Sequence, residues 1–188
     1  MDRNLANAVA RCGTVTLEGT FYRHASPSMK PTVGSNAGGR WGRTGAYPVL
    51  YLGRPRESVT VEAYRHLVDP FEGMTGAMVG PRNFYTYDVS LYEILDLTVL
   101  DHLKAVGLHH TDLTGAYDNC QAVGAAAHQL GLHGILCPAA TDLGETLSIF
   151  MTHISDAELP EVVDQIVWDS LPADPRKFRL IKGTAAES

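Results

Sequence analysis

The longest segment of this chain without a regular hydrophobic pattern runs from Ser26 to Tyr47, between two expected β-strands. It is rich in glycine, proline, serine and threonine. A loop of about 20 residues in a compact domain is usually either functional or disordered. Gly39, Arg40 and Trp41 lie within it. Glycine lets the backbone approach a ligand closely, and arginine binds phosphate through two parallel hydrogen bonds. The loop therefore indicates an anion site, although a flexible surface loop with solvated arginines would explain the same residues.

The loop does not belong to a P-loop nucleotide triphosphatase. Gly34 and Gly39 have the spacing of a Walker motif. However, Arg40 replaces its lysine, Trp41 replaces the serine or threonine that binds magnesium, and a strand rather than a helix follows. We therefore reject that class of function.

The hydrophobic pattern predicts strands and helices in no regular alternation. The expected strands are 14–24, 48–53, 84–90, 94–100, 134–137, 146–152, 166–168 and 178–181, and the expected helices are 4–11, 55–67, 101–106 and 118–130. Asp101 and Asp118 are expected helix N-caps, and Gly131 is expected to end the last helix. This pattern favours the α+β class. With 188 residues, 45% of them hydrophobic, the chain is expected to form a single domain over residues 1–188.

Composition and motifs exclude several further classes. The net charge is −6, which argues against direct nucleic-acid binding and against an anionic membrane surface. No stretch approaches the roughly 20 apolar residues of a membrane span, and no signal peptide is visible. Cys12, Cys120 and Cys137 are odd in number and form no C-x-x-C pair, so we expect buried apolar thiols in a reducing cytoplasm. No H-E-x-x-H or G-x-S-x-G motif occurs, and we expect no metal site.

Two acidic residues are candidates for chemistry. Glu62 lies on the expected helix 55–67, and Ser58, Arg65 and His66 share its face. The plain alternative is a surface ion pair between Glu62 and Arg65, three residues apart. Asp118 begins an alanine-rich helix. It could act simply as a cap, or it could lie at a helix terminus that binds a ligand.

The candidate segments gain specificity from their order along the chain. The series is FYR (21–23), GGRW (38–41), YPVLYL (47–52), VEAYR (61–65), CQAVGAAA (120–127) and GILCPAA (134–140). This series resembles the RES-domain family over about residues 15–155. The best-known members of that family are toxins of bacterial toxin–antitoxin pairs. The resemblance implies a fold similar to ADP-ribosyltransferase toxins. It also implies an enzyme that splits NAD at the nicotinamide–ribose bond by phosphorolysis or hydrolysis, or one that transfers ADP-ribose to a protein.

The resemblance also implies a set of site residues. The two family arginines match Arg23 and Arg40, the aromatic at the nicotinamide end matches Tyr51, and the family glutamate matches Glu62. Two positions depart from the family, namely His24, where the nearest toxin pattern has tyrosine, and Asp118, on which the family serine falls. The implied substrate is NAD, with no cofactor or metal, and the implied partner is a helix-turn-helix antitoxin. Assembly into a homo-oligomer is left open.

The chemistry of the implied reaction suits these residues. Breaking the N-glycosidic bond builds positive charge on the ribose, which the carboxylate of Glu62 would stabilise. Arginines would bind the pyrophosphate, and Asp118 could contact a ribose hydroxyl. A cluster of four arginines could attract a second anion and favour phosphate as acceptor: Arg40, Arg43, Arg54 and Arg56. The alternative is that Arg54 and Arg56 face solvent at the start of the helix. Water and a protein acceptor stay open, as do a catalytically silent RES-like binding domain and an unrelated α+β binding domain.

Overall fold

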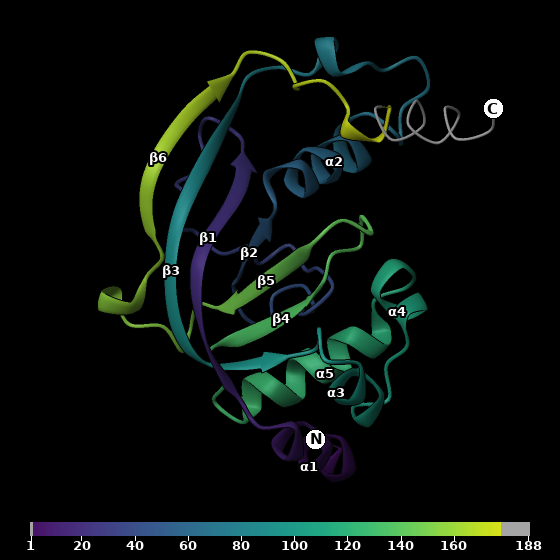
Figure 1. Ribbon diagram of the computed structural model, residues 1–188, viewed down its shortest axis with the longest axis vertical. Coiled ribbons are helices and arrows are strands. Elements are labelled where there is room, and N and C mark those ends of the chain that lie inside the picture. Colours follow the sequence, from purple (N-terminus) through teal and green to yellow (C-terminus); the bar gives the residue numbers. More distant parts are fainter. Residues whose placement is uncertain (1, 178–188) are drawn as a thin grey trace, which may run out of the picture.

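The centre of the molecule is a strongly curved sheet. A computed structural model describes residues 2–177 (Figure 1), so the expected strand 178–181 lies outside the described residues. The strands are β1 (Val15–Ala25), β2 (Val49–Arg54), β3 (Arg82–Asp96), β4 (Gly134–Pro138), β5 (Glu145–Phe150) and β6 (Glu161–Trp168). Their order in the sheet is β1-β2-β5-β4-β3-β6. Because β1 also pairs with β3, the sheet closes into a barrel-like form and β6 remains as an edge strand on β3.

Helices cover two parts of this sheet. They are α1 (Arg3–Cys12), α2 (Arg56–Leu67), α3 (Leu100–Ala105), α4 (His110–Thr114) and α5 (Asp118–Gln129). Figure 1 shows α1, α3, α4 and α5 gathered at one end of the molecule and α2 lying apart from them, beside β1 and β2. The mixture of helices with a curved sheet in one compact unit confirms the α+β class. Among the described residues, no helix has both the length and the apolar character that crossing a membrane requires.

The strand β3 corrects the sequence prediction. Two strands, 84–90 and 94–100, were expected, but β3 runs unbroken from Arg82 to Asp96, and Leu100 begins α3. Its partner β1 keeps it extended, although two residues of β3 oppose one of β1 between the pairs Leu17–Leu91 and Val15–Ile94. This bulge places Glu93 at a φ of 54°. The alternation of hydrophobic and polar residues is interrupted at the bulge, while the strand continues through it.

The helix ends follow the prediction only in part. The N-cap of α3 is Val99 and that of α5 is Tyr117, so Asp101 and Asp118 lie inside the first turns of their helices. Neither helix has a side-chain cap hydrogen bond, so both N-cap predictions were wrong. Gly131, in contrast, has a φ of 82° directly after α5, which confirms it as the residue that ends this helix.

The cysteines behave as small interior groups. Cys120 and Cys137 are buried, Cys12 is half-buried, and all three are free thiols. Burial raises the pKa of Cys137 to about 12, so this thiol stays protonated and is a poor nucleophile.

Candidate active site

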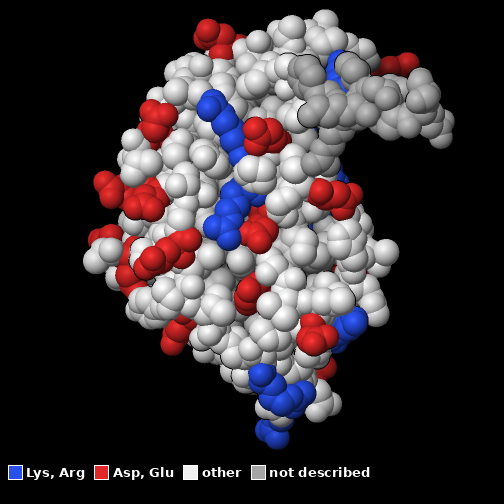
Figure 2. Space-filling view, in the orientation of Figure 1, with Lys and Arg blue, Asp and Glu red and all other residues white. Residues whose placement is uncertain are grey.

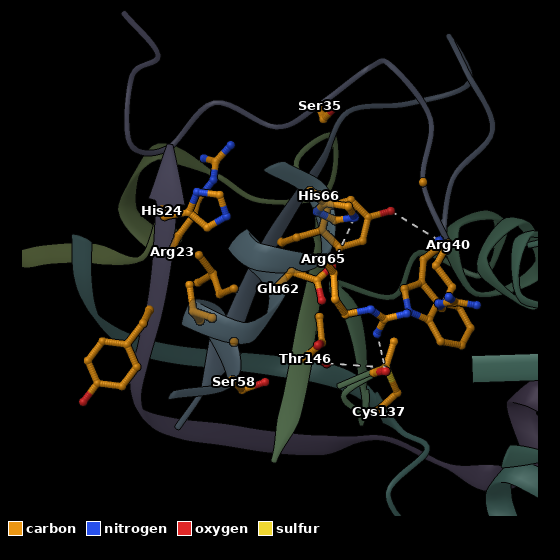
Figure 3. Close-up of a pocket in the computed structure, with 18 of the residues that line it drawn as sticks. Arg23, His24, Ser35, Arg40, Ser58, Glu62, Arg65, His66, Cys137 and Thr146 are labelled. Atoms are coloured by element: carbon orange, nitrogen blue, oxygen red, sulfur yellow. Dashed lines mark hydrogen bonds and ion pairs between the residues drawn. The ribbon is translucent and has the colours of Figure 1, made fainter. Parts of the chain in front are cut away.

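A pocket of about 360 Å³ opens between α2 and the nearby ends of the strands, within the size range of small-molecule sites (Figure 3). It is lined by β1, the loop that follows β1, β2, α2, and the end of β4 with the residues after it. Figure 2 shows carboxylates spread along the β6 side of the surface, in keeping with the net charge of −6. The arginines of the pocket therefore belong to a molecule in which acidic residues outnumber basic ones.

The pocket brings together most of the residues that the sequence singled out. Five of the six predicted site residues line it, from four different segments of the chain: Arg23, His24, Arg40, Tyr51 and Glu62. In the view of Figure 3, Glu62 lies between Arg23 and His24 on one side and Arg40 on the other. The arrangement places one carboxylate among several cationic side chains.

The sixth predicted residue, Asp118, does not line the pocket. It is exposed at the start of α5, and its neighbour Tyr117 lines the pocket instead. The end of β4 also contributes Cys137 and Pro138 to the lining, and the segment after it contributes Ala140. The ordered series of motifs in the sequence included residues 134–140 without assigning them a role. Cys137 and Pro138 are adjacent and both line the pocket, so strand alternation alone would not have identified them.

The first wall of the pocket is the stretch 38–41, which we call the loop wall. Trp41 is 1% exposed, and both its backbone N–H and its carbonyl oxygen are hydrogen-bonded. Its N–H donates to the hydroxyl oxygen of Tyr51 at 3.3 Å, and its carbonyl oxygen accepts from the hydroxyl of Tyr47 at 2.9 Å. This stretch is thus ordered and anchored, which contradicts the alternative of a flexible surface loop.

Glycines make the close packing of the loop wall possible. A Cβ atom on Gly39 would lie 2.6 Å from the hydroxyl oxygen of Tyr51, and one on Gly124 of α5 would lie 2.2 Å from the carbonyl oxygen of Trp41. The side-chain amide of Gln121, also on α5, donates to the carbonyl oxygen of Gly39 at 2.9 Å. Helix α5 therefore supports the loop wall from behind.

Arg40 projects from the loop wall with its guanidinium already oriented. Its Nη1 donates to the carbonyl oxygen of Asp112 at 2.6 Å and to that of Gly115 at 3.4 Å. The guanidinium carbon lies 4.6 Å from the centre of the Tyr117 ring. Because the neutral protein groups around it leave its charge uncompensated, Arg40 can attract an anionic group in the pocket.

The other three arginines of the expected cluster lie elsewhere. Arg43 is exposed, Arg54 pairs with Glu145 with 2.7 Å between Nη2 and Oε2, and Arg56 lies over the ring of Phe84. None of the three lines the pocket. The expectation of a four-arginine cluster was therefore wrong. Arg65, which the sequence analysis placed on the face of Glu62, is the arginine that lines the pocket instead.

Tyr51 lines the pocket from β2. Burial raises its pKa to about 12. The phenol therefore stays neutral at any physiological pH, and it can offer a hydrogen bond and an aromatic face but no charge. This suits the neutral end of a ligand better than its phosphates.

Arg23 and His24 come from the end of β1. Nη1 of Arg23 donates to two carbonyl oxygens of the long loop, those of Pro31 at 2.8 Å and Val33 at 3.1 Å. Arg23 therefore fixes the loop as well as contributing charge. Burial, and then the charge of Arg82, lowers the pKa of His24 from 6.5 to about 3. His24 is thus neutral at pH 7, and its Nδ1, 3.2 Å from the Arg82 guanidinium, accepts a hydrogen bond.

The second wall is the face of α2 that carries Ser58, Glu62, Arg65 and His66, which we call the helix wall. Oε1 of Glu62 lies 3.5 Å from Nε2 of His66, one turn further along the helix, and the Glu62 side chain is 42% exposed. Arg65 donates instead to the carbonyl oxygen of Ala140. The alternative of a Glu62–Arg65 surface pair was therefore wrong, and the carboxylate of Glu62 remains accessible from the pocket.

Comparison with known proteins agrees with this geometry. The RES domain family model matches residues 16–176. The NAD(+) phosphorylase MbcT of Mycobacterium tuberculosis and Mycobacterium bovis is 29% identical over 170 residues, 87% of this chain and 91% of the relative. The "Probable NAD(+) phosphorylase Rv3189" of M. tuberculosis is 32% identical over 82% of this chain and 75% of its own length.

Among solved structures, a chain of the M. tuberculosis MbcT–MbcA toxin–antitoxin complex superposes with a TM-score of 0.79. It is 26% identical, and the match covers 97% of this chain and 98% of that one. The order of the motifs, the pocket that they form and these likenesses lead to one conclusion: the chain belongs to the RES domain family.

Proposed function

We propose that this protein is an NAD phosphorylase and the toxin of a toxin–antitoxin pair. The observation that carries the proposal is the accessible carboxylate of Glu62, the one carboxylate that lines the pocket among the described residues, together with Arg23, Arg40 and Tyr51. The names of the relatives, NAD(+) phosphorylases over most of the chain, support the same reaction.

In the proposed reaction, the bond between nicotinamide and ribose breaks, and nicotinamide leaves with the electron pair as a neutral base. Positive charge builds on the ribose, and the carboxylate of Glu62 stabilises it. Arg40 binds the pyrophosphate and so orients the reacting half of NAD. Tyr51, neutral and largely enclosed, lines the nicotinamide end. NAD is a substrate here, and the proposal includes no cofactor.

The acceptor decides the name of the reaction, and one experiment separates the alternatives. Purified protein is incubated with NAD, with and without inorganic phosphate, and the products are resolved by mass. Phosphorolysis yields ADP-ribose 1″-phosphate only in the tube with phosphate. Free ADP-ribose at the same rate in both tubes would establish hydrolysis. Modification of a protein only after addition of cell lysate would establish ADP-ribosylation, and an intact NAD pool throughout would establish a silent relative.

The proposal includes the setting in which the enzyme acts. The partner is a helix-turn-helix antitoxin, the compartment is the cytoplasm, and the curved sheet around the pocket is of the ADP-ribosyltransferase type. The MbcT–MbcA complex supports the partner, since a chain of it matches this one over nearly its full length. Expression of this chain should lower the cellular NAD level, and co-expression of the cognate antitoxin should restore it. NAD that stays constant in both strains would refute the toxin role.

A further inference from the structure

The pocket holds one arginine more than the two that the family resemblance assigns to the NAD site. Among the described residues, three arginines line it, Arg23, Arg40 and Arg65, against one carboxylate, that of Glu62. The lining therefore has a surplus of two positive charges (three minus one). The pyrophosphate of NAD carries two negative charges, so the contacts of each arginine, rather than this sum, identify the one that is available to a second anion.

The three arginines differ in how far the protein already occupies them. Arg23 donates to two loop carbonyls and to the Met29 sulfur, and Arg40 donates to two carbonyls and stacks on an aromatic ring. Arg65 makes a single hydrogen bond within the described residues, to the carbonyl oxygen of Ala140. A guanidinium has five N–H donors in a planar fork. Arg65 is therefore the pocket arginine with the most donors left for a ligand.

Arg65 is also well placed relative to the reacting carboxylate. Arg65 lies three residues after Glu62, and Ser58 lies four residues before Glu62. The three side chains therefore share one face of α2. Figure 3 shows the side chain of Arg65 extending past Glu62 toward Cys137. The hydroxyl of Ser58, 3% exposed, lies 2.9 Å from that of Thr141. Over about two helical turns, the wall thus offers a hydroxyl, a carboxylate and a guanidinium.

We propose that Arg65, assisted by the hydroxyl of Ser58, binds the inorganic phosphate that attacks the ribose. This inference rests on the proposed phosphorylase function and names the residue that holds its second substrate. A phosphate oxygen forms a bond to the ribose carbon as the bond to nicotinamide breaks, and the electron pair of that bond stays on nicotinamide. The hydrogen phosphate dianion needs no proton transfer in this step, and the product is a singly protonated phosphate ester.

The charge of Arg65 offsets an electrostatic repulsion within the pocket, between phosphate and Glu62. A phosphate dianion must approach the ribose beside the carboxylate of Glu62, which repels it. A guanidinium on the same helix face offsets that repulsion. Its planar edge binds two oxygens of the phosphate through two parallel hydrogen bonds. Neutral water gains no such advantage. In this arrangement, Arg65 selects phosphate over water, while Glu62 acts on the ribose.

The test is steady-state kinetics of the full chain with NAD and inorganic phosphate varied independently. Arg65→Gln should raise the KM for phosphate about 10-fold or more and leave the KM for NAD within about twofold, because one charged contact to the acceptor is lost. Arg65→Lys should recover part of the loss. Arg56→Gln is the matched control, since Arg56 begins the same helix and lies over Phe84 outside the pocket.

A second measurement does not depend on turnover. Titration of inorganic phosphate, followed by phosphorus NMR, should show weaker binding to Arg65→Gln than to the native chain. Equal phosphate binding by both proteins would overturn the inference, as would a KM for NAD that rises as much as the KM for phosphate. The latter result would assign Arg65 to the pyrophosphate or to the support of α2. A native chain that never consumes NAD would overturn the proposed function, while the phosphate titration would still decide the role of Arg65.

Discussion

The two walls of the pocket differ in how the protein uses their polar groups. In the loop wall, the backbone of residues 39–41 is bonded to Tyr47, Tyr51 and Gln121, and Arg40 is held by two carbonyls. In the helix wall, Glu62 has one partner at 3.5 Å and Arg65 has one carbonyl. The first wall is thus a rigid surface that orients a ligand, and the second presents groups that the protein leaves available for reaction.

The largest effect should come from Glu62→Gln in the helix wall. Glutamine keeps the size but removes the charge that stabilises the ribosyl cation, and we expect turnover to fall by about 10²-fold or more, on the order of 3 kcal/mol. Stability should change little, since the side chain is 42% exposed. Glu57→Gln, at the exposed start of the same helix, is the control. Near-normal NAD cleavage by a folded Glu62→Gln protein would refute the catalytic role of Glu62 in the helix wall.

A substitution that disturbs the loop wall should lower the stability of the protein rather than its catalytic rate. In Gly124→Ala, the new methyl group would meet the carbonyl oxygen of Trp41, so α5 or the loop must move. We expect a loss of about 2 kcal/mol, or a fall in Tm of about 4–8 °C in a thermal melt. Gly80→Ala is the control, because a Cβ atom there meets nothing within 4 Å. A higher Tm in Gly124→Ala, the usual result for alanine in a helix, would show that the wall is not rigid.

A smaller effect is expected from Arg40→Lys, which keeps the charge of the loop wall but loses the planar fork. NAD binding should weaken by about 10-fold, measured by calorimetry. Arg43→Lys, exposed in the same loop, should bind NAD as the native chain does. Equal affinities of the Arg40 variant and the native chain would return Arg40 to a purely structural role.

The smallest effect is expected from Asp118→Ser, which touches neither wall. Asp118 is exposed and makes no cap hydrogen bond, so NAD turnover should stay within about twofold of the native rate. A strong gain in activity would instead bring residue 118 into the reaction and would favour a native chain that is catalytically weak.

Sequence reasoning succeeded where the information was local or lay in ordered motifs. The helix boundaries around α1, α2 and α5 follow from hydrophobic spacing and from Gly131. The segments that hold Arg23, Arg40, Tyr51 and Glu62 converge on one pocket, although only the resemblance linked them. Periodicity alone would have left Glu62 on an ordinary helix surface.

Sequence reasoning failed where the position of a side chain depended on long-range strand pairing or on the rotation between two consecutive residues of a helix. Arg54 was grouped with its sequence neighbours, yet its register partner on β5 is Glu145, 91 residues away. Asp118 was assigned to the site, but Tyr117 lines the pocket, and one residue along a helix turns the side chain by about 100°. No local pattern contains either fact.

The pocket is lined by residues that span the chain from Tyr22 to Thr146, and this has a consequence for protein synthesis. β1 must pair with β3 some 60 residues later, and β2 can pair with β5 only after Phe150 has been made. At about 5–20 residues per second, a nascent chain passes many seconds without a complete pocket. On the proposed function, a ribosome that stalls before β5 releases a harmless fragment, and damage to the NAD pool begins only with nearly finished chains.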